Sequence, residues 1–183
     1  MNTVLKKPTR NELNEIDMAD IVDIVHSEMQ PFVVNDAGKD HYRLLRYIGR
    51  NFMGSIYEVG THRGASSTSL SEAVRKIITY DIQSWEKCSI STNEYRVKNP
   101  LEDIKELSLA GLIFYDTAHD GVVEREFMTA LENNNFNGIV VLDDIYLNDE
   151  MKSFWNDIKQ YKEDWTDVGH WSGTGVVYFN YNK

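Results

Sequence analysis

Apolar residues along this chain form short continuous runs and stretches with helical spacing, which follow one another in turn. Nearly continuous apolar runs at residues 55–59, 111–116 and 138–144 are typical of strands buried on both faces of a parallel sheet. Shorter runs at residues 76–82 and 95–98 predict two more strands. Helical spacing between two of the runs is shown by Val123, Phe127, Ala130 and Leu131. The pattern therefore predicts an α/β fold in which helices connect parallel strands.

The N-terminal part is predicted to be helical and to precede the first strand. After a polar tail, apolar residues at helical spacing predict a helix over residues 12–29. Residues 35–40 predict a turn-rich loop, and a second short helix follows with Gly49 as its C-cap. Residues 1–50 are therefore interpreted as a tail and a helical cap, which covers either the sheet or the mouth of a ligand site.

The C-terminal part predicts a change from parallel to antiparallel pairing. A helix with Asn148 as its N-cap is expected after the strand at residues 138–144. Two strands follow, at residues 166–171 and 176–179, with a glycine-containing turn between them. Because so short a connection joins antiparallel neighbours, the sheet is expected to end in a hairpin.

Residues 55–67 run from a strand into a helix through a turn that contains two glycines. Gly60 and Gly64 allow a tight bend and let a ligand approach main chain that no Cβ shields. The next strand ends in Asp81, about 20 residues after Gly60, where a carboxylate can bind the two ribose hydroxyls of an adenosine ligand. The helix after the turn is expected to carry an apolar stripe formed by Leu70, Ala73, Val74 and Ile77. The alternative is a tight α/β turn that binds no ligand.

The spacing of the glycines favours one adenosine ligand over another. A dinucleotide turn has the pattern Gly-x-Gly-x-x-Gly, whereas three residues separate the glycines here, and Glu58 before them would repel a pyrophosphate. The pattern Glu58-x-Gly60-x-x-x-Gly64-x-Ser66 resembles the first motif of class I S-adenosylmethionine (SAM)-dependent methyltransferases. The positively charged ammonium and sulfonium groups of SAM suit a nearby carboxylate. The resemblance implies that SAM is bound by Glu58, Gly60, Thr61, Gly64, Ser66 and Asp81.

The order of the predicted elements extends this resemblance to about residues 50–180. A doubly wound, mostly parallel sheet that ends in an antiparallel hairpin is similar to the seven-stranded, Rossmann-like fold of class I methyltransferases. With 183 residues, the chain is expected to form a single domain overall, in which residues 51–183 bind SAM behind the N-terminal cap. Asn99, followed by Pro100, is interpreted as a helix N-cap rather than as an adenine contact.

The composition limits the kinds of partner that the chain is expected to bind and the compartment in which it is expected. The net charge is −10 and no cluster of Lys and Arg is present, which argues against a nucleic acid held through its phosphates. A single cysteine, Cys88, excludes an internal disulfide and fits a reducing compartment. No apolar run reaches the ~18 residues of a membrane span, and residues 1–10 lack the apolar core of a signal peptide. The chain is therefore expected in the cytoplasm without a membrane partner, with a small-molecule or glycan acceptor, and a homo-oligomer stays open.

Carboxylates stand at the ends of four predicted strands: Glu58, Asp81, Asp116 and the pair Asp143 and Asp144. The carboxyl ends of parallel strands meet at one edge of a sheet, so these groups are expected to converge on one crevice. Like charges gathered there repel one another unless a cation neutralises them. The strands near residues 113–119 and 138–144 look like those of small macrocin-type and catechol-type O-methyltransferases. That resemblance implies a divalent ion, usually Mg²⁺, held by Asp116, Asp143 and Asp144, which suits all-oxygen ligation.

Two departures affect this metal site. The related pattern often reads Asp-Gly-x-His, where this chain has Thr117, and Gly-Gly, where this chain has Asn137 before Gly138. Asp143 and Asp144 are adjacent, so they would point to opposite sides of a regular strand. Both can bind one ion only if the chain bends between them. The alternative is a solvated strand end that also caps the next helix.

His119 is the candidate general base beside Asp116, and it could equally orient that carboxylate. His26 and His41 are interpreted as surface or packing histidines, and His170 as a structural residue, with a position at the substrate mouth as the alternative. Together these features predict a SAM-dependent O-methyltransferase in which His119 and Asp116 are catalytic. The alternatives are a non-catalytic domain that binds an adenosyl ligand and, less favoured, an NAD-dependent enzyme.

Overall fold

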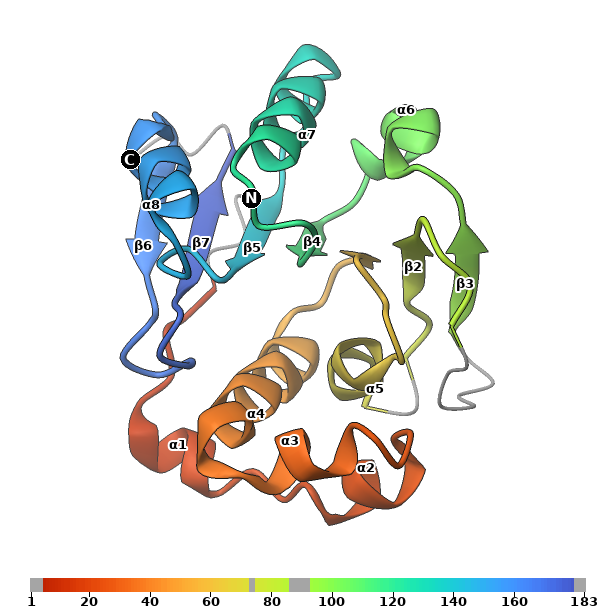
Figure 1. Cartoon of the computed structure of the whole chain (residues 1–183), viewed down its shortest axis with the longest axis vertical. Coiled ribbons are helices and arrows are strands. Elements are labelled where there is room, and N and C mark those ends of the chain that lie inside the picture. The colour runs from red at the N-terminus through yellow and green to blue at the C-terminus, as the bar shows by residue number, and fades with distance from the viewer. Residues whose placement is uncertain (1–4, 73–74, 86–92, 180–183) are drawn as a thin grey trace.

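A seven-stranded sheet lies between two layers of helices in the computed structural model, which describes residues 5–72, 75–85 and 93–179 (Figure 1). The strands are β1 (Ile56–Val59), β2 (Ile78–Asp81), β3 (Glu94–Val97), β4 (Leu112–Tyr115), β5 (Ile139–Asp143), β6 (Tyr161–Asp164) and β7 (Thr174–Tyr178). Their order in the sheet is β3-β2-β1-β4-β5-β7-β6. The first five strands pair in parallel, and β7 is antiparallel to both β5 and β6. The predicted fold class, with its C-terminal hairpin, is confirmed.

The helices divide between the two faces of the sheet. They are α1 (Arg10–Asn14), α2 (Ala19–Ile24), α3 (Gln30–Val34), α4 (Asp36–Asn51), α5 (Ala65–Ser71), the 3₁₀ helix η1 (Pro100–Asp103), α6 (Ile104–Leu107), α7 (Val122–Asn133) and α8 (Asp149–Asp157). Figure 1 shows α4 and α5 on one side of the sheet with α1 to α3 outside them, and α6, α7 and α8 on the other side. Within the described ranges, no helix combines the length and apolarity needed to cross a bilayer.

Successive side chains of the central strands point to opposite faces of the sheet, and each face has its own hydrophobic core. In β5, Ile139 and Val141 belong to the core that α4 covers, whereas Val140 and Leu142 belong to the core under α7 and α8. All residues of β4 and β5 are buried, as expected of strands covered on both faces. The sheet is therefore a rigid support for the loops that follow the carboxyl ends of its strands.

The predicted single helix over residues 12–29 is wrong, because the chain forms two short helices there, α1 and α2, and α3 begins at Gln30. Thr9 and Glu12 form a capping box that starts α1. The side chain of Asp17 then accepts from the main-chain nitrogen of Ala19 at 2.9 Å, which starts a new turn and separates α1 from α2. These local hydrogen bonds compete with a continuous helix, although the apolar residues still face the core.

The loop predicted at residues 35–40 is also wrong, since Asn35 is the N-cap residue of α4. Gly49 lies inside this helix and is not its C-cap. A Cβ at Gly49 would lie 2.2 Å from the carbonyl oxygen of Leu70, so the glycine lets α4 and α5 pack closely. The predicted apolar stripe ends early as well: α5 stops at Ser71, and Ile77 is buried in front of β2, while residues 73–74 lie outside the described ranges.

The hairpin is confirmed, but its first strand was predicted at the wrong residues. The strand is β6, and residues 166–171 form a turn instead. Asp164 ends the strand, because its side chain accepts from the main-chain nitrogen of Thr166 at 2.9 Å. The turn brings His170 next to the end of β5, where it contacts Asp143.

Candidate functional site

A cavity of about 700 Å³ opens at the carboxyl ends of β1, β2 and β4. Gly60, Asp81 and Asp116 line it, each from the end of a different strand. His62 and Trp85 add aromatic surface, and their rings meet edge to face with centroids 4.7 Å apart. The cavity lies where the strand order reverses beside β1, which is the usual ligand position in a doubly wound sheet.

The turn after β1 requires a glycine at residue 60. Its φ is +93°, and a Cβ there would lie 1.5 Å from the carbonyl oxygen of Asp116. No rearrangement of a side chain can relieve a contact with main chain. The main-chain nitrogen of Gly60 donates to the carbonyl of Tyr80 at 2.8 Å, which ties the turn to β2. Gly60 therefore holds the ends of β1, β2 and β4 at close distance around the cavity.

Asp81 is held in place by main-chain donors. One carboxylate oxygen accepts from the nitrogens of His62 at 2.8 Å and Thr61 at 3.2 Å, and the other accepts from Gln83 at 2.8 Å. A carboxylate has about four acceptor positions, so one remains for a ligand. Asp81 lines the cavity with that capacity, and its contact with ribose hydroxyls stays a prediction.

Glu58 is fully buried beneath the turn. Its carboxyl group accepts from the hydroxyl of Thr79 at 2.5 Å. Burial raises the pKa of Glu58 to about 8, against the opposing effect of hydrogen bonds from Ser66 and Thr79. Glu58 does not line the cavity, and neither do Thr61, Gly64 and Ser66. The contact of these four residues with SAM stays a prediction.

Six side chains, which we call the His–Asp cluster, gather beside the cavity at the ends of β4 and β5. They are His41, Asp116, His119, Asp143, Asp144 and His170. The Nε2 atom of His119 lies 3.2 Å from Asp116 and 3.5 Å from Asp144. Asp116 belongs to both the cluster and the cavity wall, so a ligand in the cavity would lie next to the cluster.

The chain bends at Asp144, as a shared ion at Asp143 and Asp144 requires. Asp144 has φ +57°, a left-handed conformation that turns its side chain to the same side as that of Asp143. Asp143 Oδ1 lies 2.6 Å from His170 Nε2, and Asp144 Oδ1 lies 3.7 Å from His170 Nδ1. Both carboxylates therefore face the same histidine.

Glu124 organises the loop that carries His119. Its buried carboxylate accepts from the hydroxyl of Thr117 at 3.1 Å and from the main-chain nitrogen of His119 at 3.0 Å. His119 takes the left-handed conformation in this loop, with φ +55°. Thr117, which replaces the glycine of the related pattern, is thus accommodated, and the imidazole of His119 still faces Asp116.

The histidines of the cluster differ in their protonation. Burial lowers the pKa of His119, but its hydrogen bond with Asp116 and the nearby carboxylate charges raise it to about 9. Burial and the charge of His170 lower the pKa of His41 to about 3, so that ring is neutral. Burial and the charge of Asp143 both raise the pKa of Asp116. A proton on His119 thus balances part of the negative charge of the carboxylates around it.

The predicted metal ligands lie in this cluster, but the ligand atoms that come within 4.8 Å of one another there belong to Asp116, His119 and Asp143, and Asp144 is not in that group. Asp116, Asp143 and Asp144 all reach this cluster, and carboxylate oxygens are the ligands that Mg²⁺ prefers. Asp144 Oδ1 is buried and has no hydrogen-bond partner among the described residues. Such an atom is costly unless a proton or a cation lies against it. A divalent ion beside Asp144 would supply that partner, and one ion shared by Asp116, Asp143 and Asp144 stays a prediction.

Two members of the cluster, His41 and His170, had been interpreted as packing residues. His41 comes from α4 and His170 from the turn before β7, so about 130 residues of chain separate them (41 to 170). Neither has a local motif around it. Only the packing of α4 against the sheet and the corrected position of β6 bring them to Asp143, and no periodicity in the sequence could have shown this.

Comparison with solved structures confirms the fold. No family model matches the sequence, and a comparison with curated proteins finds no match. PaMTH1, an SAH-bound methyltransferase of Podospora anserina, is 14% identical, with a TM-score of 0.59, 99% of this chain and 100% of the other covered. The O-methyltransferase TomG of Streptomyces achromogenes, solved in complex with SAM, is 17% identical, with a TM-score of 0.62 and coverages of 90% and 92%. A methyltransferase of Geobacter sulfurreducens is 15% identical, with a TM-score of 0.64 and coverages of 91% and 93%.

Proposed function

We propose that this chain is a SAM-dependent methyltransferase that methylates a hydroxyl group of a small molecule or sugar. The observation that carries the proposal is the position of Asp116, which lines the cavity expected to hold SAM and also belongs to the His–Asp cluster. An acceptor bound at the cluster would therefore lie beside the methyl donor. Methyl transfer depends mainly on such placement, because holding the reacting groups in line can supply about 7–11 kcal/mol.

In this proposal the two sides of the site have different tasks. Gly60 and Asp81 position the donor, the first by its close main-chain approach and the second by its free acceptor capacity. Asp116, Asp143 and Asp144 hold a divalent ion, for which Mg²⁺ is the expected choice. Such an ion would supply a positive charge that favours ionisation of an acceptor hydroxyl.

His119 is proposed to accept the proton of that hydroxyl. A pKa of about 9 keeps the ring protonated at neutral pH, where it cannot act as a base. The high pKa arises from the carboxylates around it, so a cation that neutralises them would lower it again. The cation and the base are therefore expected to act together, and His119 would be a poor base without the ion.

Calorimetric titration of the purified chain with S-adenosylhomocysteine (SAH), with and without Mg²⁺, tests the donor site. Transfer is then measured as SAH formed from SAM with simple catechols and free hexoses as acceptors. Asp116→Asn is expected to lower turnover by about 10²-fold or more, while SAH affinity changes much less. The exposed residue Asp149, whose side chain is 95% exposed, provides the matched control Asp149→Asn.

The outcomes separate the proposal from its alternatives. SAH binding without transfer to any acceptor in a wide panel would favour a non-catalytic adenosyl-binding domain. Binding of NAD that is tighter than binding of SAH would favour a dinucleotide enzyme. Transfer that persists unchanged in Asp116→Asn would remove this carboxylate from the mechanism.

A further inference from the structure

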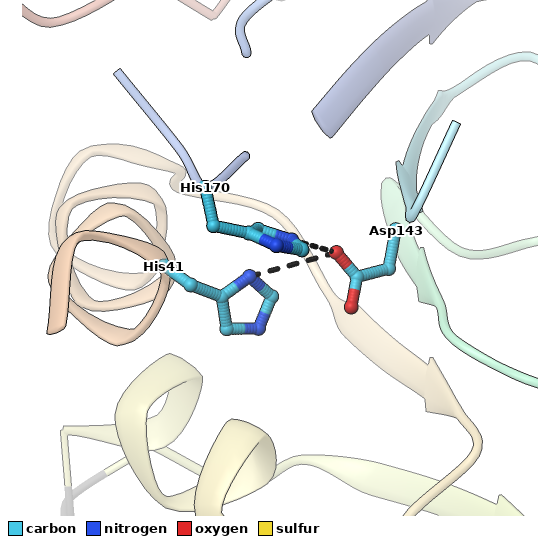
Figure 2. Close-up of side chains that lie close together, drawn as sticks. All are labelled: His41, Asp143 and His170. Atoms are coloured by element: carbon cyan, nitrogen blue, oxygen red, sulfur yellow. Dashed lines mark hydrogen bonds and ion pairs between the residues drawn. The ribbon is translucent and has the colours of Figure 1, made fainter. Parts of the chain in front are cut away.

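Three side chains of the His–Asp cluster form a smaller group, of which the proposed methyl transfer uses only Asp143. Figure 2 shows the rings of His41 and His170 directed at the same carboxylate oxygen of Asp143. The distances to that oxygen are 2.6 Å from His170 Nε2 and 3.5 Å from His41 Nδ1. The ring centroids lie 4.6 Å apart, and the rings are almost perpendicular. Two nitrogens and one oxygen thus point to one small volume, and the candidate ligand atoms lie within 4.8 Å of one another.

We propose that His41, Asp143 and His170 bind a first-row transition-metal ion, such as Mn²⁺, Fe²⁺, Co²⁺ or Zn²⁺, in preference to Mg²⁺. Imidazole nitrogen is a good ligand for these ions, whereas Mg²⁺ and Ca²⁺ require oxygen ligands. Two imidazoles with one carboxylate are a common ligand set for transition ions. This inference concerns metal binding alone and does not depend on methyl transfer.

An ion would provide a partner for the Nδ1 atom of His41. His41 is 8% exposed, and its Nδ1 is buried without a hydrogen-bond partner among the described residues. A buried polar atom left in this state destabilises the folded chain. The atom is aimed at Asp143, but at 3.5 Å the contact does not meet the requirements of a hydrogen bond. An ion between them would satisfy both groups.

The ring of His170 is held by a hydrogen bond on the side opposite Asp143, as in many metal sites. Its Nδ1 lies 2.7 Å from the hydroxyl of Ser172, which is itself buried. When the hydroxyl accepts from Nδ1–H, the lone pair on Nε2 faces Asp143, and a cation is needed between the two acceptors. Histidines that bind metals usually donate their other N–H in this way, which fixes the ring and its tautomer.

A hydrogen-bonded arrangement without metal is the competing explanation. In that case Ser172 donates to Nδ1 of His170, and Nε2–H donates to Asp143. This arrangement satisfies His170 but leaves Nδ1 of His41 without a partner. A metal ion satisfies both histidines, and it needs a separation of about 3 Å between His170 and Asp143, since metal–ligand bonds are about 2.0–2.2 Å long. The side chains would have to move apart by only several tenths of an ångström.

The test measures metal binding to the full chain after dialysis against a chelator. Co²⁺ is titrated in while its d–d absorption and the heat of binding are recorded, and Mg²⁺ is titrated separately. We expect one Co²⁺ per chain with an affinity at least 10²-fold higher than that of Mg²⁺, and weak displacement by excess Mg²⁺. His41→Gln and His170→Gln should each lower Co²⁺ affinity by about 10–100-fold or more and leave Mg²⁺ affinity within about threefold.

Matched variants keep the test decisive. His62→Gln changes a histidine of the cavity wall, and His119→Gln changes a cluster histidine that contacts Asp116 and Asp144 instead. His62→Gln is expected to retain Co²⁺ affinity within about threefold, because His62 supplies no ligand. His119→Gln, which changes a neighbouring group that shares Asp143, is expected to lower Co²⁺ affinity less than His41→Gln does. If His41→Gln does not fold, Ser172→Ala replaces it, and about tenfold weaker Co²⁺ binding is then expected.

The proposal is overturned if Co²⁺ does not bind, if it binds no more tightly than Mg²⁺, or if the variants at His41, His170 and Ser172 bind it as the unmodified chain does. SAH titration of the same samples reports separately on the cavity. A chain that binds SAH but not Co²⁺ would contradict only the transition-metal site. A chain that binds Co²⁺ but not SAH would contradict only the proposed methyltransferase.

Discussion

The two sides of the candidate site deal with buried acidic groups in different ways. At the glycine turn, Asp81 receives three main-chain N–H donors, and Glu58 keeps its proton because burial raises its pKa to about 8. In the His–Asp cluster, the carboxylates face imidazoles, and Asp144 Oδ1 and His41 Nδ1 have no hydrogen-bond partner among the described residues. Main chain positions the acidic groups on the first side, whereas side chains from distant elements position them on the second.

This difference indicates which side changes most when it binds a ligand. Groups already satisfied by main-chain donors need little rearrangement, so the glycine turn is close to its ligand-bound form. The cluster lacks partners that a cation would provide, and its histidines change protonation when one binds. We therefore expect the cavity at the glycine turn to change little on binding a ligand and the His–Asp cluster to rearrange if it binds an ion.

The largest effect on the free energy of unfolding is expected at Gly60, whose main chain lies against the carbonyl of Asp116. Gly60→Ala would place a Cβ 1.5 Å from the carbonyl oxygen of Asp116 and would force an alanine to φ +93°. We expect a loss of more than about 4 kcal/mol in the free energy of unfolding, or no folding at all. Urea titration followed by circular dichroism measures this. His62→Ala, in the same turn, is the control and should unfold within about 1 kcal/mol of the unmodified chain, and a stable Gly60→Ala chain would contradict the geometry of the turn.

The next effect concerns the proton on Glu58. Its folded pKa of about 8 lies above the ordinary value of 4.5, so the folded chain keeps a proton that the unfolded chain loses between these values. The free energy of unfolding contributed by Glu58 is therefore highest below pH 4.5 and falls as the pH rises to 8. One pKa unit corresponds to 1.36 kcal/mol, so this fall is on the order of 5 kcal/mol.

Glu58→Gln tests the proton directly, because glutamine has nearly the same shape and stays neutral. Unfolding is measured at several pH values between 4.5 and 8 for both chains. The difference in stability between them should change with pH, in favour of the glutamine variant at the alkaline end. Parallel curves for the two chains would show that Glu58 does not titrate in this range.

The fold could be predicted from the sequence because the buried central strands are recognisable as continuous apolar runs. Continuous apolar runs such as residues 111–116 follow from burial on both faces, and glycine spacing and a terminal acid mark the turn and its partner strand. The segments predicted wrongly are those in which local hydrogen bonds decide the structure. Asp17 interrupts a helical pattern, and Asp164 ends β6 earlier than its apolar neighbours suggest.

Of the candidate site, only the residues at the ends of strands could be predicted from the sequence. Asp81, Asp116, Asp143 and Asp144 follow from the rule that parallel strands end at one edge. The bend at Asp144 could be named as a requirement, but only the structure supplies its φ of +57°. His41 and His170 lie in segments whose position depends on packing across the whole sheet, so their approach to Asp143 has no sequence signal.

The smallest effect is expected at Asp81. Its measurement tests whether the cavity at the glycine turn binds the methyl donor. Asp81→Ala should weaken SAH binding by about 1–3 kcal/mol, roughly 5- to 150-fold, because a buried ligand hydroxyl loses its acceptor. Asp81→Asn keeps the shape and one acceptor oxygen, so it should lie between the two. The carboxylate also holds the nitrogens of Thr61 and His62, and thermal unfolding of each variant separates a loosened turn from a lost contact. Unchanged SAH affinity in a folded Asp81→Ala chain would remove the ribose contact, and the main-chain approach at Gly60 would then have to position the ligand alone.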